Sequence, residues 1–423
     1  RSGSVMGRPE LLLEPRSTPG VMAAKLLLPR GSACDPAGQR GAHQLLAALL
    51  TRGCGPHNHQ QLAELIEGRG AGLRSEAHED GLLISLRCAS EDARELLPSL
   101  AWMVTAPHLE PDQLELERQL SVQALVRQRE DPVQIAFDGW RNLTYGEGGY
   151  GHDPLGIEAD LISLERSSLE PLASDLQRQP AVLALCGQWP DQLTQQFGTL
   201  PGFASWPPGT ADAGQLPDTG AEHSNNRLHG SVMATEQVVV MLGQATIPHG
   251  HPDDLALRLL ACHLGAGMSG LLFQRLREEN GVAYETGVHH PVRAGAAPFL
   301  LHASTSADRA DLTLRLLMQI WWELREGLLD QAELALARAK FIGQMAHAGQ
   351  TCSQRAERNV QLCGLGLPQD FDQQCQSSLE SLDAEALRQV ADRWLHRPSL
   401  SLCGPRQSLE TLSRLWCSQS SRS

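Results

Sequence analysis

The chain has 423 residues, 41% of them hydrophobic, which is enough to bury a sizeable core shared between two or three domains. Its formal charge of -14 at pH 7 argues against nucleic acid and anionic membrane surfaces as partners, because both repel an acidic surface. Ten cysteines occur without a C-x-x-C pair, which argues against a zinc ribbon or a redox dithiol and favours reduced thiols in a cytoplasmic protein.

The N-terminal residues 1–15 contain no long apolar stretch, so no signal peptide is predicted. Because the chain does not begin with Met, a removed upstream signal and a periplasmic location stay open as the alternative to the cytoplasm. The longest apolar runs, such as 238–242, are too short to cross a bilayer, and no membrane insertion is expected.

Short strand-like runs alternate with amphipathic helical runs along the chain, which predicts an α+β fold. In the first half, we expect strands at 22–28 and 81–88 and helices at 92–104 and 111–127. A stretch rich in Pro, Gly, Asp, Asn and Ser indicates a long linker. The predicted division is therefore an N-terminal domain 8–200, a linker 201–229 and a C-terminal domain 230–412.

The two halves resemble each other. Each contains a strand, a helix and then a second helix that opens with D-Q-x-E-L, at 112–116 and at 330–334. Any strand, helix, helix unit capped by Ser or Asp would look broadly alike, but the recurring motif favours a duplication. We therefore expect two homologous domains, each a mixed sheet with helices on one side.

The helix expected at 42–50 stands where a zinc-binding motif can be looked for. A zinc hydrolase of the H-x-x-E-H type needs two imidazoles one turn apart, a general-base Glu and a third carboxylate ligand. In that register the chain has His43, Leu46 and Ala47. A single imidazole cannot hold a catalytic zinc, and a hydrogen-bonded surface or boundary histidine is the simpler interpretation of His43.

The segment 265–270 matches the dinucleotide fingerprint G-x-G-x-x-G, but a helix precedes it where a strand is required, which argues against a nucleotide site. The remaining histidine pairs could be metal ligands but are interpreted as solvent-facing loop residues; they are His57 and His59, His249 and His251, and His289 and His290. Cys262 beside His263 could be a nucleophile, but both lie in an apolar helix with no evident orienting acid.

Residues 20–164 resemble the N-terminal domain of the insulinase and mitochondrial processing peptidase family, whose active members read roughly G-x-A-H-F-L-E-H at this helix. The run from Gly41 to His43 and the later 152–156 retain the family pattern. The resemblance implies that Leu46 stands at the general-base position and Ala47 at the second histidine. It also implies that Ala124 stands at the downstream carboxylate.

The segment 265–287, which extends into a strand expected at 282–289, resembles the C-terminal domain of the same family. By that resemblance, Arg277 and Tyr284 stand at the residues that hold the substrate backbone and the developing oxyanion. The alternative is that Arg277 pairs with a neighbouring acid such as Glu278, and that Tyr284 packs in a sheet.

The resemblance implies one half of a clam-shell and a non-catalytic, substrate-binding subunit of a heterodimeric zinc metalloendopeptidase. Its partners would be extended peptides and a chain of the same family that carries H-x-x-E-H and the zinc, so this chain would hold no cofactor. Two alternatives stay open. One is a structural or assembly subunit like the core proteins of respiratory complexes, and the other is a zinc peptidase with unorthodox ligands.

Overall fold

A computed structural model describes residues 8–17, 20–207, 220 and 227–420, so most of the predicted linker 201–229 lies outside the described residues. The chain forms two compact units, and each unit takes segments from both halves of the sequence. Unit 1 draws on residues 1–125, 153–217 and 346–371, and unit 2 draws on residues 126–152, 218–345 and 372–423.

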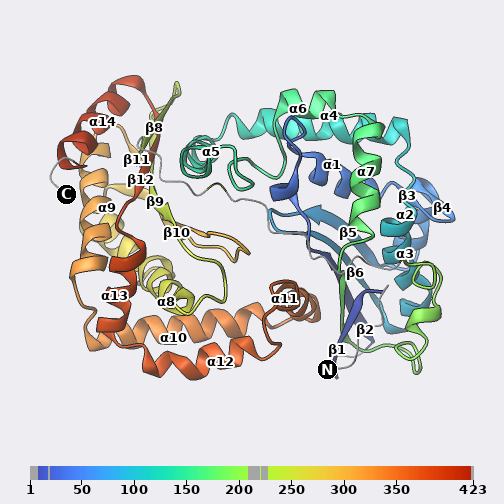
Figure 1. The fold of residues 1–423 in the computed structure, drawn as a ribbon. Coiled ribbons are helices and arrows are strands. Elements are labelled where there is room, and N and C mark those ends of the chain that lie inside the picture. Colours follow the sequence, from blue (N-terminus) through green and yellow to red (C-terminus); the bar gives the residue numbers. More distant parts are fainter. Residues whose placement is uncertain (1–7, 18–19, 208–219, 221–226, 421–423) are drawn as a thin grey trace. The chain divides into compact units, whose positions relative to one another are not determined.

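Unit 1 is built on a five-stranded sheet in the order β1-β7-β2-β6-β5 (Figure 1). The β1 strand runs parallel to β7, and the other neighbours are antiparallel. The strands are β1 (Glu10–Pro15), β2 (Val21–Leu28), β5 (Gly72–Ala77), β6 (Leu82–Ala89) and β7 (Val182–Gly187). A two-stranded ribbon of β3 (Gly53–Cys54) and β4 (His57–Asn58) accompanies this sheet.

Unit 2 repeats this topology. Its sheet has the order β8-β12-β9-β11-β10, again with one parallel pair, β8 and β12, at the same end. The strands are β8 (Leu228–Val232), β9 (Gln237–Ala245), β10 (Ala283–His289), β11 (Pro298–Ser306) and β12 (Ser399–Gly404). Two sheets with the same strand order and the same pairing directions confirm the predicted pair of homologous α+β domains.

In unit 1, one face of the sheet packs against most of the helices. Alternate residues of β2, such as Met22 and Leu26, are buried together with Leu45 of α1 and Leu100 of α3, as the period of two in a strand requires. The helices are α1 (Ala42–Leu50), α2 (His59–Glu67), α3 (Ala93–Thr105), α4 (Pro111–Gln128), α6 (Glu158–Ser163) and α7 (Arg166–Leu176), with short 3-10 turns at Ser32–Cys34, Ser90–Asp92 and Phe197–Thr199.

In unit 2, the corresponding core centres on Phe299 of β11 and Trp321 of α9, whose rings meet edge to face with centroids 6.1 Å apart. The Trp321 indole also donates a hydrogen bond to the Leu395 carbonyl oxygen, so its polar atom is satisfied. The helices are α8 (Asp254–Gly265), a π-helix η4 (Phe273–Glu279), α9 (Ala310–Glu326), α10 (Gln331–Ala348), α12 (Phe371–Ser378), a 3-10 turn (Leu379–Ser381), α13 (Ala384–Trp394) and α14 (Arg406–Ser420).

The opposite face of the unit 1 sheet is covered by α11 (Cys352–Gly364), a helix that follows the linker in sequence (Figure 1). Ala356 and Val360 of α11 are buried against β7, and Lys25 Nζ lies 2.7 Å from Glu357 Oε2. Helices therefore cover both faces of this sheet, and the expectation of helices on one side was incomplete.

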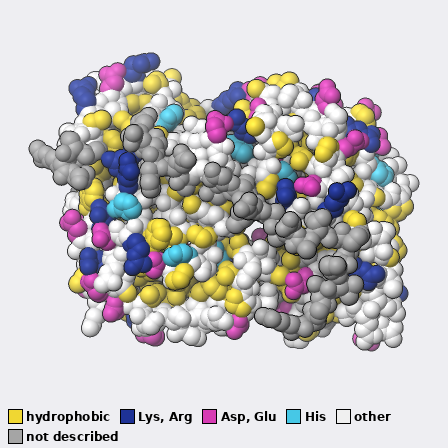
Figure 2. All heavy atoms as spheres, viewed as in Figure 1, with side chains coloured by type: hydrophobic (Ala, Val, Ile, Leu, Met, Phe, Trp, Pro, Cys, Tyr) yellow, Lys and Arg dark blue, Asp and Glu magenta, His cyan; other side chains and the backbone are white. Residues whose placement is uncertain are grey.

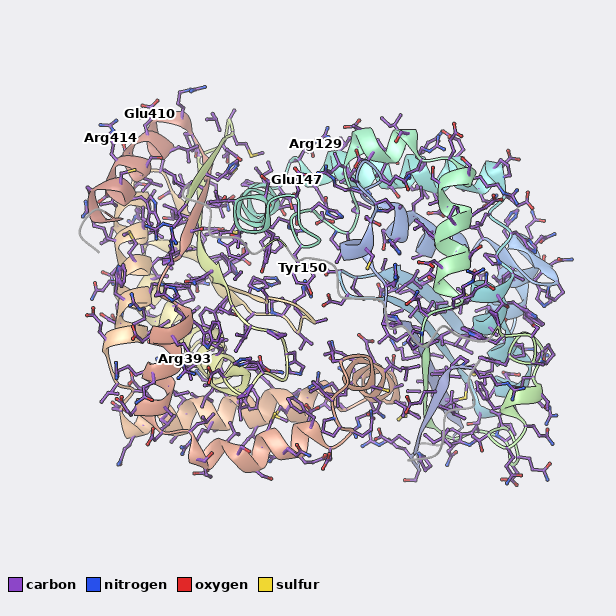
Figure 3. All side chains as sticks on the ribbon, in the orientation of Figure 1. Arg129, Glu147, Tyr150, Arg393, Glu410 and Arg414 are labelled. Carbon is purple, nitrogen blue, oxygen red and sulfur yellow. The ribbon has the colours of Figure 1, made fainter. Side chains whose placement is uncertain are left out.

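The unit 2 sheet is likewise covered by a helix from the other half of the sequence. The helix α5 (Pro132–Tyr145) precedes the linker and packs on β8, β9 and β12. Gly139 makes this approach possible, because a Cβ at this position would lie 2.3 Å from His229 Cδ2. Farther along the same segment, Tyr150, labelled in Figure 3, accepts a hydrogen bond from the Gly295 N–H at 2.9 Å. Each sheet thus depends on a helix from the other half of the chain.

Among the described residues, no helix is long and apolar enough to span a membrane. On the face shown in Figure 2, Lys and Arg side chains are interspersed with Asp and Glu side chains. No large area of one sign is visible on that face.

Candidate functional site

His43 lies at the start of α1, where Asp35 fixes it. The Asp35 carboxylate accepts a hydrogen bond from His43 Nδ1 at 2.7 Å and from the His43 backbone N–H at 3.0 Å. Its second oxygen accepts from the Gly41 N–H at 2.7 Å. One carboxylate therefore satisfies the exposed end of the helix backbone and the imidazole together. The expected hydrogen bond of His43 is present, but the expectation of a surface or boundary position was wrong, because His43 is only 2% exposed.

The residues at the zinc positions do not fit a metal. Leu46 and Ala47 are fully buried in the apolar core of unit 1, and neither side chain offers a lone pair. Ala124, half-buried on α4, offers none either. The described residues include no group of three or more His, Cys, Asp or Glu side chains able to hold a metal ion. This donor set leaves a single imidazole, already bonded to Asp35.

Arg277 and Tyr284 lie close together in unit 2, on either side of the turn between η4 and β10. Arg277 Nη1 donates a hydrogen bond to the Tyr284 backbone carbonyl oxygen at 3.3 Å, and the guanidinium stands 5.2 Å from the centre of the Phe273 ring. Within the described residues, no ion pair joins Arg277 to Glu278 or Glu279. The guanidinium is exposed and retains further donors.

Backbone irregularities surround these two residues. The helix η4 has π-type hydrogen bonding, an uncommon form that is frequent at functional sites. The register of β10 against β11 shifts between Ala283 and Glu285, so Tyr284 sits in a bulge. A bulge turns a side chain away from its regular direction, and Tyr284 is 66% exposed. The alternative that Tyr284 packs in the sheet is therefore wrong for its side chain.

Two residues that the sequence analysis did not identify, Arg309 and Thr305, form hydrogen bonds with the turn between Arg277 and Tyr284. Gly281 has a φ of +59°, in the left-handed region that favours glycine. Arg309 Nη1 donates to the Gly281 carbonyl oxygen at 2.6 Å, and Thr305 Oγ1 donates to the Val282 carbonyl oxygen. These contacts hold the segment between Arg277 and Tyr284 in one conformation. No motif marks Arg309 or Thr305, because their role depends on contacts distant in sequence.

The other sequence candidates form no comparable site. His249 is buried and the His290 side chain is only 3% exposed, contrary to the expectation that they face solvent. His249 Nδ1 lies 2.7 Å from Asp254 Oδ2. Burial lowers the pKa of His290, whose Nδ1 meets the Pro298 carbonyl oxygen at 2.8 Å. Burial raises the pKa of Cys262 to about 11, which disfavours the thiolate that a nucleophile needs.

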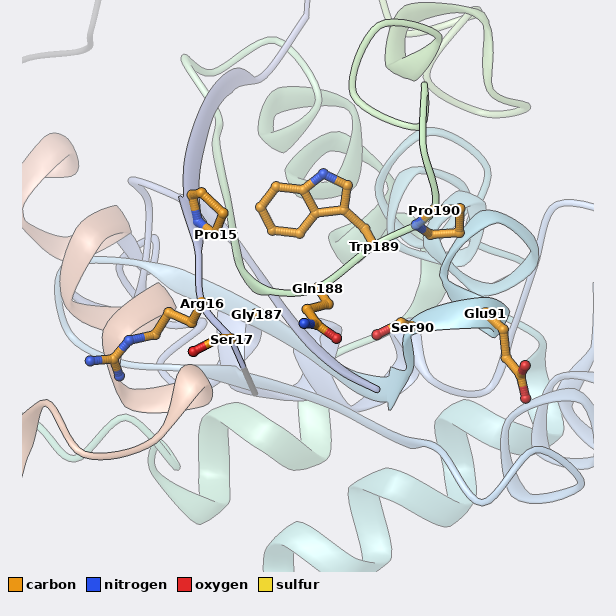
Figure 4. A pocket seen from close by; sticks show the side chains of 9 residues that line it. All are labelled: Pro15, Arg16, Ser17, Ser90, Glu91, Gly187, Gln188, Trp189 and Pro190. Carbon is orange, nitrogen blue, oxygen red and sulfur yellow. The ribbon is translucent and has the colours of Figure 1, made fainter. Parts of the chain in front are cut away.

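A separate hollow of about 720 Å³ opens on unit 1, at the ends of β1, β6 and β7 (Figure 4). It contains none of the predicted site residues. Its lining consists of Pro15, Arg16, Ser17, Ser90, Glu91, Gly187, Gln188, Trp189 and Pro190.

Known proteins resemble this chain in sequence and in fold. Residues 178–341 match the peptidase M16 inactive domain, a stretch that includes Arg277 and Tyr284 but begins well after α1. The protein named uncharacterized zinc protease YmxG of Bacillus subtilis is 21% identical over 351 residues, which cover 82% of this chain and 84% of that protein. The protein named non-peptidase homolog YmxG of Helicobacter pylori is 23% identical over 372 residues, with coverages of 86% and 83%.

Among solved structures, the peptidase M16 inactive domain from Pseudomonas fluorescens superimposes with a TM-score of 0.84 at 20% identity. The match covers 94% of this chain and 96% of that chain, so the two folds agree over nearly their whole length. The matches in sequence and in fold together confirm the resemblance to the M16 peptidases, the insulinase type.

Proposed function

We propose that this M16-type, peptidase-like chain is the non-catalytic, substrate-binding subunit of a heterodimeric zinc metalloendopeptidase. A second chain of the same type, with an intact H-x-x-E-H, would supply the zinc and the general base. The observation that carries the proposal is an asymmetry between the two units. The zinc positions of unit 1 are filled by buried Leu46 and Ala47, whereas Arg277 and Tyr284 of unit 2 are exposed and held together.

Arg277 and Tyr284 suit the stabilisation of a peptide carbonyl. A guanidinium has five N–H donors in a fixed plane, and a tyrosine hydroxyl adds one more. Such donors stabilise the charge that develops on a carbonyl oxygen during hydrolysis when they are positioned in advance. Preorganisation is supported here by the contacts of Arg309 and Thr305 with the intervening turn.

An extended peptide could be held beside these donors. Of the strands described, β10 pairs with β11 alone, so one row of its backbone groups faces outward at the edge of the sheet. An edge strand binds a peptide by adding it as a further strand, with main-chain hydrogen bonds that tolerate many sequences. Because Tyr284 lies at the start of β10, we propose that peptides lie along this edge.

We also propose that the chain lies in the cytoplasm, because none of its ten cysteines, all of them in the described part of the chain, is in a disulfide. Zinc belongs to the partner in this proposal, because the donor set of unit 1 does not fit it.

The proposal is tested by purifying the full chain alone and together with an M16-type chain that has an intact H-x-x-E-H. We expect the chain alone, with zinc added, to bind no stoichiometric metal and to leave a mixture of unstructured peptides uncut, while the complex cuts them. Tightly bound zinc and hydrolysis by the chain alone would support unorthodox ligands instead. A stable complex whose hydrolysis is no faster than that of the partner alone would support a structural subunit.

A further inference from the structure

Two cysteines that are far apart in sequence meet where α11 crosses the unit 1 sheet. Cys186 is the last residue but one of β7, and Cys352 is the first residue of α11. Both belong to one buried cluster, together with Ala184 and Ala356. A Cβ placed on Gly187, the residue after Cys186, would lie 3.4 Å from Cys352 Sγ. The two cysteines are therefore neighbours where β7 packs against α11.

We propose that Cys186 and Cys352 are a modification site, at which a peroxide oxidant converts the two thiols into one disulfide that joins β7 to α11. The proposal does not depend on the proposed peptidase function.

The reaction balances with hydrogen peroxide as the oxidant. The thiolate of Cys352 attacks one peroxide oxygen, the O–O bond breaks, and the product is a sulfenic acid together with one water once the released hydroxide is protonated. The sulfur of Cys186 then attacks the sulfenic sulfur, the S–O bond breaks, and a second water leaves. Two thiols lose two protons and two electrons, and one peroxide is reduced to two waters.

The two thiols differ in the way that this order requires. Cys352 is 8% exposed and is the first residue of α11. Cys186 is fully buried, and burial together with the neighbouring Cys352 thiol raises its pKa to about 12. Gly187, which follows Cys186 and lies beside Cys352 Sγ, lines the hollow of Figure 4, so a small oxidant would approach Cys352 from that side. Cys352 reacts first, and Cys186 resolves the intermediate.

The disulfide would change the stability of unit 1. The helix α11 follows the linker in sequence and covers the sheet only through non-covalent contacts with residues such as Lys25 and Glu14. A bond between β7 and α11 closes a long loop of chain, and closing a long loop restricts the unfolded state most strongly. The oxidised protein is therefore more resistant to thermal unfolding than the reduced protein.

The test treats the purified full chain with hydrogen peroxide, blocks the remaining thiols and analyses a digest by mass spectrometry without reduction. We expect one intramolecular cross-link between the peptides that contain Cys186 and Cys352, and a higher Tm that returns to the starting value after reduction. Neither C186S nor C352S should give the cross-link. The exposed Cys417 provides the matched control, because C417S should keep both the cross-link and the shift in Tm.

Two results would overturn the proposal. In one, Cys417 reacts while Cys186 and Cys352 both remain free thiols at the same peroxide dose. In the other, Cys352 is oxidised to sulfinic acid with no cross-linked peptide. Circular dichroism of C352S shows whether the variant is folded, and the cross-link in the wild-type chain decides the question even if it is not.

Discussion

The Arg277 guanidinium donates a hydrogen bond to the backbone carbonyl oxygen of Tyr284 at 3.3 Å, across the turn that separates η4 from β10. The contact fixes the position of Arg277 relative to the strand that carries Tyr284. It leaves the Tyr284 hydroxyl and most of the guanidinium N–H groups available. The Arg277 guanidinium therefore lies at the start of β10, the strand that carries Tyr284.

The link between Asp35 and His43 predicts a structural role for the remaining histidine of the zinc motif. We expect Asp35→Ala to lower the free energy of unfolding by about 2 kcal/mol, because a buried imidazole and two backbone N–H groups lose their acceptor. Asp311→Ala, which removes only an exposed pair with Arg315, should cost about 0.5 kcal/mol or less. Urea unfolding of the three proteins measures the difference, and equal losses would contradict the prediction.

The approach of α5 to the unit 2 sheet predicts a strong effect at a glycine. We expect Gly139→Ala to destabilise the protein by about 1–3 kcal/mol, because the added methyl group overlaps His229 and Ser401. Gly343→Ala on α10 is the matched control, since a Cβ there meets nothing within 4 Å and alanine favours a helix by about 0.5–1 kcal/mol. Thermal unfolding that ranks the two variants in the reverse order would show that α5 does not pack as described.

Several partly buried histidines predict a loss of stability in mild acid. Burial lowers the pKa of four of them, His229, His263, His290 and His302. The unfolded chain takes up protons near the ordinary value of about 6.5, and the folded chain does so only at lower pH. Stability therefore falls as the pH falls through about 6.5. His78 acts in the opposite sense, because the hydrogen bond with Glu76 raises its pKa and its contribution is lost only as the pH rises through that raised value.

Measurements of Tm between pH 7.5 and pH 5.5 test this balance. We expect Tm to decrease toward pH 5.5 and the decrease to be smaller in His302→Gln, which removes one buried imidazole. His59→Gln, at an exposed position of α2, is the control and should keep the wild-type slope. A Tm that rises toward pH 5.5 would mean that the stabilisation from His78 is larger than the combined destabilisation from His229, His263, His290 and His302.

Local patterns predicted several of the regular elements. The helix expected at 42–50 is α1, and the strand expected at 22–28 is β2, because apolar residues repeat with the period of each element. The recurring D-Q-x-E-L motif correctly indicated two sheets of one topology.

Features that depend on distant contacts could not be predicted in this way. The helices α5 and α11 each pack on a sheet whose strands come mainly from the other half of the sequence, and such contacts leave no local pattern. The acceptor of His43, the bulge at Tyr284 and the meeting of Cys186 with Cys352 are likewise invisible to spacing. The roles of Arg277 and Tyr284 stay predictions.

In the proposed function, Arg277 and Tyr284 serve a reaction whose metal lies in another chain. The direct test is the kcat/KM of the reconstituted complex with wild-type chain, Arg277→Gln and Tyr284→Phe. Arg315→Gln is the control, because Arg315 is an exposed arginine of the same unit that pairs with Asp311. We expect each site variant to lower kcat/KM by about 100-fold or more, as the loss of one donor to a developing oxyanion does, with complex formation unchanged. Activity equal to that of Arg315→Gln in both site variants would contradict the account.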